Sequence, residues 1–262
     1  MVATTPLGEA AWEICRVYVQ PRLHGAGLGR ALLELAERHA IGAGATDLVL
    51  WTDTRFRRAH RFYENQSYVR AGPVRALDDI ARTIEYRYAK PVHGVRALDV
   101  AGAQSAERAL GRLLQACVAA GDPVLFLPPL PPERALACWQ AVTRRVGEGA
   151  AKLFAAWSEG VLAGTVQLGL DTPEDGRHRA TIDTLLVHPA FRRRGLGNAL
   201  MEAAETAASA AGRSLLELAA RPGDGAETLC RRRAWTEAGR IEGYTRDAAG
   251  RPHPSVILVK QI

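Results

Sequence analysis

Two stretches of the chain carry glycines and cations at a spacing that suits anion binding. One occupies residues 19–33 and the other residues 187–201. In each, an apolar run typical of a strand leads into a glycine-containing turn, and apolar residues at helical spacing follow the turn. Free backbone N–H groups and the helix dipole attract anions at such a helix N-terminus, and glycine allows a bulky phosphate to come close. The pattern therefore predicts a ligand that carries phosphate.

The two stretches are copies of each other at a constant offset of 168 residues, from Val19 to Val187. Ten residues are identical in this register without a gap. They are the valine, the proline, both closing glycines, the leucine between them, an Ala-Leu pair, and the helix residues Glu34/Glu202, Ala36/Ala204 and Glu37/Glu205. Such self-similarity indicates an internal repeat of a whole structural unit.

The shared pattern V-x-P-x-x-[R/Q]-x-x-G-x-[G/A] resembles the acetyl-coenzyme A pyrophosphate loop of the GNAT superfamily of N-acetyltransferases. In the first copy His24 stands where the family usually has Arg or Gln. The resemblance implies an α/β fold with a mixed (α+β) sheet flanked by helices, and acyl transfer from acetyl-CoA to an amine. It also implies that the following residues bind the cofactor, with the strand backbone at 185 and 187 holding the pantetheine: Val19, His24, Gly25, Ala26, Gly27, Leu28, Gly29, Leu185, Val187, Arg192, Arg193, Arg194, Gly195, Leu196, Gly197 and Asn198.

Acetyl transfer to an amine sets requirements that single out a few further residues. An amine with a pKa of about 10 is protonated near neutrality, so the reaction needs a base, donors for the oxyanion and an acid for the CoA thiolate. In the family the base is often a Glu on the fourth strand, and the acid is often the Tyr of an A-x-x-x-Y segment. The corresponding positions hold Glu13 and Tyr63 in the first unit but Thr181 and Cys230 in the second. The oxyanion donor would be a backbone N–H on the fourth strand.

The second unit has an alternative base. Asp183 lies two residues after Thr181, on the same strand face. Each candidate also has a purely structural interpretation. Glu13 could be a surface carboxylate, Tyr63 a packing aromatic, Asp183 a structural hydrogen-bonding group and Cys230 a small buried hydrophobe.

Residues 1–92 resemble only part of a GNAT domain, from its fourth strand onward. After a short leader (1–11), we expect strands at 12–19, 48–51, 68–70 and 83–88, and helices at 27–43 and 57–65. The first three strands and two helices of the domain have no room before Glu13. Either this unit is truncated, or its missing strands come from elsewhere in the chain or from a second copy in a homodimer.

Residues 93–262 resemble a complete GNAT domain. We expect a strand at 95–100, helices at 106–120 and 133–146, and a hairpin of 152–158 and 161–170. A proline-rich connector at 125–132 separates the two helices. A strand at 181–187, the loop and a long Ala-rich helix follow. A strand at 215–219, a helix at 226–233 and strands around 235–241 and 255–260 complete the unit.

The composition limits the class of protein. A chain of 262 residues with about half of them apolar suits two modest domains, and the net charge of +6 favours an anionic partner such as CoA. Nucleic acid is not expected, because interleaved aromatics and a helix-turn-helix signature are missing. The seven histidines lack metal-ligand spacing, and the four scattered cysteines suit reduced thiols. With no signal peptide and no membrane-length apolar run, we expect a cytoplasmic protein.

Two hypotheses of different class remain. The first is an N-acetyltransferase, one half unit plus one complete unit, that moves acetyl from acetyl-CoA to a primary amine of a small molecule or protein terminus. The second is a non-catalytic CoA-binding or interaction module, suggested by the loss of both usual catalytic residues in the second unit. The loops that would select the acceptor carry no motif.

Overall fold

The computed structural model describes all 262 residues, which form two compact units. Unit 1 comprises Met1–His93 with Trp157–Val161, and unit 2 comprises Gly94–Ala156 with Leu162–Ile262. Each unit has a mixed sheet and a hydrophobic core of its own. No helix combines the length and apolar character that a membrane crossing needs.

Unit 1 contains a sheet of six strands in the order β1-β2-β3-β6-β4, with β5 also paired to β6. Its strands are β1 (Ala3–Pro6), β2 (Ala11–Cys15), β3 (Asp47–Asp53), β4 (Val69–Arg70), β5 (Arg75–Ala76) and β6 (Ile84–Pro91). Only β2 and β3 run parallel. The helices α1 (Leu28–Gly42) and α2 (Arg57–Asn65) bury Leu33, Ala36 and Tyr63 in one core with the sheet residues Leu48 and Leu50.

The expectation of a leader at residues 1–11 is wrong. Residues 3–6 form β1, which pairs antiparallel with β2 and aligns Thr5 with Glu13. Four residues ending in a proline carry too little alternation to be recognised as a strand, although an edge strand tolerates proline. Within residues 1–93, no further strand or helix precedes β2.

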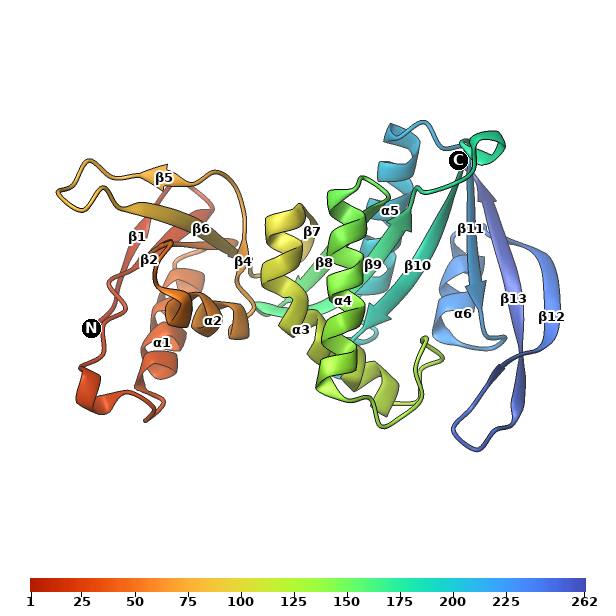
Figure 1. The fold of residues 1–262 in the computed structure, drawn as a ribbon, viewed down its shortest axis with the longest axis horizontal. Helices are drawn as coiled ribbons and strands as arrows, with labels where there is room; N and C mark the ends of the chain where they lie inside the picture. Colours follow the sequence, from red (N-terminus) through yellow and green to blue (C-terminus); the bar gives the residue numbers. More distant parts are fainter. The chain divides into compact units, whose positions relative to one another are not determined.

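Unit 2 contains a sheet of seven strands in the order β12-β13-β11-β10-β9-β8-β7. Its strands are β7 (Gly94–Leu98), β8 (Ala151–Ser158), β9 (Val161–Gly169), β10 (Arg179–Val187), β11 (Leu215–Ala220), β12 (Thr236–Arg246) and β13 (Pro252–Gln261). The helices are α3 (Val100–Ala119), α4 (Pro132–Gly147), α5 (Leu196–Ala210) and α6 (Gly225–Arg232). Figure 1 shows α3 and α4 crossing one face of the sheet and α5 lying behind it.

The core of unit 2 forms where α5 meets the sheet. Leu200, Met201, Ala204 and Ala208 recur at helical spacing, are fully buried, and pack with sheet residues such as Leu216. Small alanine side chains let α5 approach the strands closely. Helix α3 starts six residues earlier than the apolar spacing predicts, because Asp99 accepts a hydrogen bond from the Gly102 N–H (2.7 Å) and caps the helix there.

The internal repeat extends to the backbone. Helices α1 and α5 have the same length and start 168 residues apart. Strands β3 and β11 also start 168 residues apart. Left-handed conformations recur at the same offset, with φ of 57° at Arg16 and 50° at Thr184, and 79° at Gly27 and 83° at Gly195. The backbone thus follows the same path before and after the loop in both units.

In each unit, one glutamate links the helix that follows the glycine loop to the sheet. In unit 1, Glu37 on α1 lies 2.6 Å from Lys90 Nζ and accepts a hydrogen bond from Tyr68 Oη at 2.9 Å. In unit 2, Glu205 on α5 lies 2.8 Å from Lys260 Nζ and accepts a hydrogen bond from Trp235 Nε1 at 3.0 Å. The two glutamates are aligned in the repeat, so the pattern of an acid, an aromatic and a lysine is retained.

Candidate functional site

The glycine loop of unit 2 presents an uncapped helix N-terminus. After β10 the chain makes one short 3-10 turn (Pro189–Phe191) and then reaches α5 through Arg193 (φ 64°) and Gly195 (φ 83°). Gly195 is the N-cap residue and offers no side chain to the first N–H groups of α5. These donors and the positive end of the helix dipole can therefore bind an anion.

Close packing explains the second glycine of the loop. A methyl group on Gly197 would lie 3.2 Å from Leu229 Cδ2, whereas one on Gly195 would meet nothing within 4 Å. Gly197 thus lets α5 pack against α6, and Gly195 supplies the left-handed turn with open space before it. The two glycines are therefore needed for different physical reasons, although they belong to one motif.

Three arginines of the loop take different places. Arg192 Nε donates to Val187 O at 3.2 Å, and its guanidinium forms an ion pair with Asp122. Arg194 Cζ lies 5.0 Å from the centre of the Phe191 ring. Arg193 and Arg192 line a cavity, and Arg194 does not. Asn198 accepts a hydrogen bond from Arg233 Nη1 at 2.6 Å.

The strands next to the loop separate from each other. Parallel pairing of β10 with β11 stops after Thr181 and Glu217, although both strands continue. On its other side, β10 shifts register against β9 between Asp183 and Leu186, around the left-handed Thr184. Backbone groups of the intervening residues are thus released from the sheet, which is the function of a β-bulge next to a site.

A cavity of about 1460 Å³ occupies this separation. It is lined by the loop, by β10 at Asp183, Leu185 and Val187, by α4, and by the ends of β11 and β12. Hence the structure brings together Leu185, Val187, Arg192, Arg193, Gly195, Leu196, Gly197 and Asn198. Its mixture of apolar and charged walls is typical of a small-molecule site.

Asp183 faces this cavity and is held by neighbours. Thr181 Oγ1 donates a hydrogen bond to Asp183 Oδ2 at 2.9 Å. A methyl group on Gly169 would overlap Thr181 Oγ1 and lie 3.2 Å from Asp183 Oδ2 and 3.4 Å from Arg145 Nη2. The side chains of Thr181, Asp183 and Arg145 therefore converge over Gly169. This arrangement orients the Asp183 carboxylate beside the Arg145 guanidinium.

Cys230 lies elsewhere. It is fully buried in the core of unit 2, on the helix α6, and is not among the residues that line the cavity. Burial raises the pKa of its thiol to about 12, and the carboxylates of Asp224 and Glu205 act in the same direction. The structure thus gives Cys230 the surroundings of a packing residue. All four cysteines are free thiols.

The loop of unit 1 repeats this backbone. Gly25 (φ 85°) and Gly27 (φ 79°) take the places of Arg193 and Gly195, and Gly27 leaves α1 without a side-chain cap. His24 Nε2 lies 3.0 Å from Val19 O, so its side chain reaches the carbonyl equivalent to the one that Arg192 contacts in unit 2. The helix N-terminus formed by Ala26, Gly27, Leu28 and Gly29 has the geometry of an anion site.

The two catalytic candidates of unit 1 differ in their surroundings. Glu13 is half-buried on β2, directly opposite Thr5 of β1. Tyr63 is 9% exposed, and its ring lies in the core beside the rings of Phe62 and Tyr68. Burial raises the pKa of the Tyr63 hydroxyl to about 12. Tyr63 therefore contributes to packing, whatever else it does.

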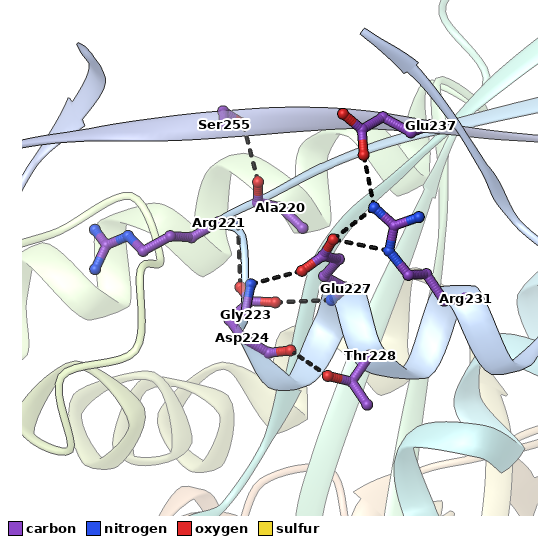
Figure 2. A network of polar contacts seen from close by, with 9 residues as sticks. All are labelled: Ala220, Arg221, Gly223, Asp224, Glu227, Thr228, Arg231, Glu237 and Ser255. Atoms are coloured by element: carbon purple, nitrogen blue, oxygen red, sulfur yellow. Dashed lines mark hydrogen bonds and ion pairs between the residues drawn. The ribbon is translucent and has the colours of Figure 1, made fainter. Parts of the chain in front are cut away.

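Several residues of the cavity were not identified from the sequence. Arg221 follows β11, Thr245 lies near the end of β12, and Arg145 comes from α4. Figure 2 shows the turn between β11 and α6, where Asp224 caps the helix by accepting from the Glu227 N–H at 2.7 Å. One sequence signal could have indicated Arg221. It follows the strand predicted at 215–219, which comes after the strand that leads into the glycine loop.

Known proteins support a family assignment. The model of a family described as acetyltransferase (GNAT) family matches residues 1–68 and 123–232, more than half of the chain. Among curated proteins, the mycothiol acetyltransferase of Kineococcus radiotolerans is 39% identical over 107 residues, which cover 40% of this chain. The chain matches about a third (34%) of that relative's length.

Solved structures share the fold at low identity. A ribosomal-protein-alanine N-acetyltransferase from Brucella melitensis is 20% identical with a TM-score of 0.53, covering 64% of this chain and 99% of its own. The yncA protein of Salmonella typhimurium, determined with its cofactor acetyl-CoA, is 19% identical with a TM-score of 0.53, covering 65% and 94%. A GCN5-related N-acetyltransferase from Kribbella flavida is 19% identical with a TM-score of 0.54, covering 65% and 98%.

Proposed function

The chain belongs to the acetyltransferase (GNAT) family, and from this premise we propose that it transfers acetyl from acetyl-CoA to a primary amine of a small molecule or protein terminus. We place the reaction in unit 2 and treat residues 93–262 as the complete GNAT domain and residues 1–92 as a partial one. The observation that carries the proposal is the uncapped N-terminus of α5 at the mouth of the cavity between the separated strands β10 and β11.

The residues present suit acetyl-CoA. The first N–H groups of α5, with Arg192 and Arg193 beside them, would hold the pyrophosphate, which carries negative charge. The edge of β10 that faces β11 has no strand partner beyond Thr181, and its backbone near Leu185 and Val187 would bind the amide groups of the pantetheine. When bound, acetyl-CoA supplies an activated acetyl group as a thioester.

Asp183 would act as the base. An acceptor amine enters as an ammonium and must lose a proton before its nitrogen can add to the acetyl carbonyl carbon. Asp183, oriented by Thr181, can accept that proton directly or through water. Backbone N–H groups released at the bulge around Thr184 would stabilise the oxyanion as the new C–N bond forms. The C–S bond then breaks, and the electron pair leaves with sulfur.

The leaving group does not need Cys230. A thiol with a pKa of about 8.5 is a good leaving group as thiolate, and water can protonate it afterwards. The buried Cys230, with its raised pKa, is a poor acid for this step. We therefore assign the chemistry to Asp183 and the backbone.

Calorimetric titration with acetyl-CoA tests the site. We expect Gly195→Glu to abolish binding in unit 2, because the new side chain must adopt φ of 83° and places a negative charge before the helix. Gly27→Glu is the matched variant in unit 1. Unchanged stoichiometry and affinity in Gly195→Glu would refute the assignment to unit 2, whereas a loss confined to Gly27→Glu would move the cofactor to unit 1.

A second candidate function is a non-catalytic CoA-binding module. It is favoured by one observation, that the usual acid position in unit 2 holds a residue buried away from the cavity. This candidate predicts acetyl-CoA binding without CoA release for any amine in a broad panel. Turnover that falls at least tenfold in Asp183→Asn, with acetyl-CoA affinity retained, would exclude it.

The loop of unit 1 supports a further part of the proposal. Its backbone matches that of unit 2, so we propose that it also binds CoA, with Glu13 and Tyr63 as the family's usual base and acid. A homodimer could add the elements that precede β1 in a complete unit. If Tyr63→Phe leaves turnover unchanged at every pH, Tyr63 has no role as an acid.

A further inference from the structure

We propose that the acceptor amine carries a carboxylate group, as an amino acid does, and that Arg221 and Thr245 of unit 2 bind this carboxylate. The inference rests on the proposed function, because it concerns the second substrate of the same cavity. It starts from two buried polar atoms that lack partners.

Arg221 Nε and Thr245 Oγ1 are buried side-chain atoms without a hydrogen-bond partner. Both residues line the cavity. Only four buried side-chain atoms of the whole chain lack a partner, and two of the four are these. A buried donor without an acceptor destabilises the fold, so such groups are rare unless a ligand completes them.

Two other arginines that line the cavity already have carboxylate partners. Arg145 lies 2.7 Å from Asp171, and Arg192 forms an ion pair with Asp122. The nearest carboxylate in sequence to Arg221 is Asp224, and backbone groups occupy both of its oxygens. Asp224 Oδ1 accepts from the Glu227 N–H at 2.7 Å and Oδ2 accepts from the Arg221 N–H at 3.3 Å.

A rigid turn holds the backbone of Arg221. Besides the two bonds to Asp224, the Gly223 N–H donates to Glu227 at 2.5 Å, and Arg231 joins Glu227 to Glu237. Figure 2 shows these contacts on one side of the turn and the Arg221 side chain extending away from them and from α6. The turn thus fixes the point from which the Arg221 side chain extends, and a planar guanidinium can bind a carboxylate with two parallel hydrogen bonds.

Thr245 lies at the same end of the sheet. Strand β13 separates β11 from β12, and Ala220 pairs with Val256 while Thr245 pairs with His253. Ser255, between them, is satisfied by donating to Ala220 O at 3.2 Å. Arg221 and Thr245, the two residues with unpartnered donors, therefore lie on either side of Ser255 in the sheet order. The two oxygens of a carboxylate can accept hydrogen bonds from both donors.

The position of Arg221 separates it from the cofactor loop. Leu216, Leu218 and Ala220 face the core that α5 covers. Arg221 is the first residue after β11, and continued alternation would direct it toward the other face of the sheet. That face carries α4, whose residues Arg134 and Cys138 line the same cavity. The α5 N-terminus binds the pyrophosphate in our proposal, which leaves Arg221 for the acceptor, with Asp183 available to the amine.

Binding of matched amines tests the inference. Calorimetry with the CoA-saturated full-length protein would compare L-leucine with 3-methylbutylamine, L-phenylalanine with 2-phenylethylamine, and a tripeptide acid with its C-terminal amide. We expect at least one carboxylate compound to bind about 10- to 100-fold more tightly than its partner, as for hydrogen bonds to a charged group. Absence of binding by every carboxylate compound, or equal binding within the pairs, would overturn the inference.

Variants assign the effect to residues. Arg221→Met should remove the preference for the carboxylate compound and leave the affinity for acetyl-CoA within about twofold. Thr245→Val should weaken binding of that compound about 3- to 10-fold. Arg246→Met is the matched control, since Arg246 neighbours Thr245 but does not line the cavity. A loss of acetyl-CoA affinity of tenfold or more in Arg221→Met would instead make Arg221 a cofactor residue and refute the inference.

Stability and turnover separate the failures. Without ligand, Arg221→Met should melt no lower than the wild type, because it removes a buried donor that has no partner. A lower melting temperature would indicate a structural role and contradict the inference. CoA release from amines with no preference for a carboxylate refutes only this inference, whereas binding of both substrates without CoA release refutes the proposed transferase function.

Discussion

The carboxylate of Glu205 lies 2.8 Å from the Nζ atom of Lys260, and this contact joins the central helix α5 to the strand β13 of unit 2. Arg233 Nη2 approaches the same carboxylate at 2.8 Å, and Trp235 Nε1 donates to it at 3.0 Å. Burial acts to raise the pKa of Glu205, but these hydrogen bonds outweigh it and lower the pKa to about 2. The ionised form is thus favoured in the folded protein.

Stability of unit 2 should therefore depend on acidity through Glu205. A carboxyl with a pKa of 4.5 when unfolded and about 2 when folded stabilises the fold above pH 4.5 and loses this contribution as the pH falls toward 2. The contribution is about 3 kcal/mol. Urea unfolding of Glu205→Gln at pH 7 should show a loss of that size, and its stability should vary less between pH 5 and 3. Glu202→Gln, exposed on the same helix, is the control. Equal acid sensitivity of Glu205→Gln and wild type would contradict this account.

Glu37 and Lys90 should behave as a coupled pair in unit 1. Lys90 is 4% exposed, burial lowers its pKa, and Glu37 at 2.6 Å opposes that shift. Removing one partner strands a buried charge, so Glu37→Gln should destabilise unit 1 by about 3 kcal/mol. The double variant Glu37→Gln/Lys90→Met should recover most of this loss in denaturant unfolding. Additive losses would show that the two side chains are not coupled.

The loop histidine of unit 1 suggests an exchange in unit 2. His24 and Arg192 contact equivalent backbone carbonyls, Val19 O and Val187 O. Arg192 also pairs with Asp122 and adds a fixed charge beside the helix N-terminus. We expect Arg192→His to keep the loop conformation and to weaken acetyl-CoA binding about tenfold at pH 7.5. Arg192→Ala, which loses the carbonyl contact as well, should bind still more weakly. If calorimetry finds that Arg192→His binds acetyl-CoA no more tightly than Arg192→Ala, the contact with the Val187 carbonyl does not contribute to binding.

Much of this arrangement could be predicted from the sequence, because the signals were local. The helix 57–65 has the bounds that its spacing predicts, and the duplicated glycine turns have the left-handed conformations that glycine favours. The family match confirms the GNAT family, and the solved structures confirm the fold class. The glycine loop predicted the family because its motif requires several residue types at a fixed spacing.

Other features depended on contacts that no local pattern reports. The strand β1 is short, and its partner β2 determines its existence. The bulge at Thr184 places a β-branched residue at φ of 50°, which its residue type argues against. Arg221 and Thr245 come from different strands, and only the order β12-β13-β11 brings them to one end of the sheet. Their lack of partners is visible only when all neighbours are placed.

Gly169 should matter through Thr181 and Asp183. A methyl group at this position overlaps Thr181 Oγ1, so Gly169→Ala should displace Thr181 and break its hydrogen bond to Asp183. We expect kcat/KM to fall more than tenfold in Gly169→Ala and about threefold to tenfold in Thr181→Ala. The combination should be no worse than Thr181→Ala alone, since the overlap is gone. Fully additive losses would indicate that Gly169 acts through another contact.

Replacement of Cys230 should affect stability and not turnover. The thiol is fully buried in the core of unit 2, burial raises its pKa to about 12, and it does not line the cavity. Cys230→Ala should keep kcat within about twofold and lower the free energy of unfolding by about 1–2 kcal/mol, the cost of a small cavity. Cys230→Val, which refills that space, should recover part of the stability while lacking any acidic proton. If both variants stay folded and yet lose turnover more than tenfold, with a changed pH profile on the alkaline side, Cys230 delivers the proton to the leaving thiolate and the backbone assignment for unit 2 is wrong.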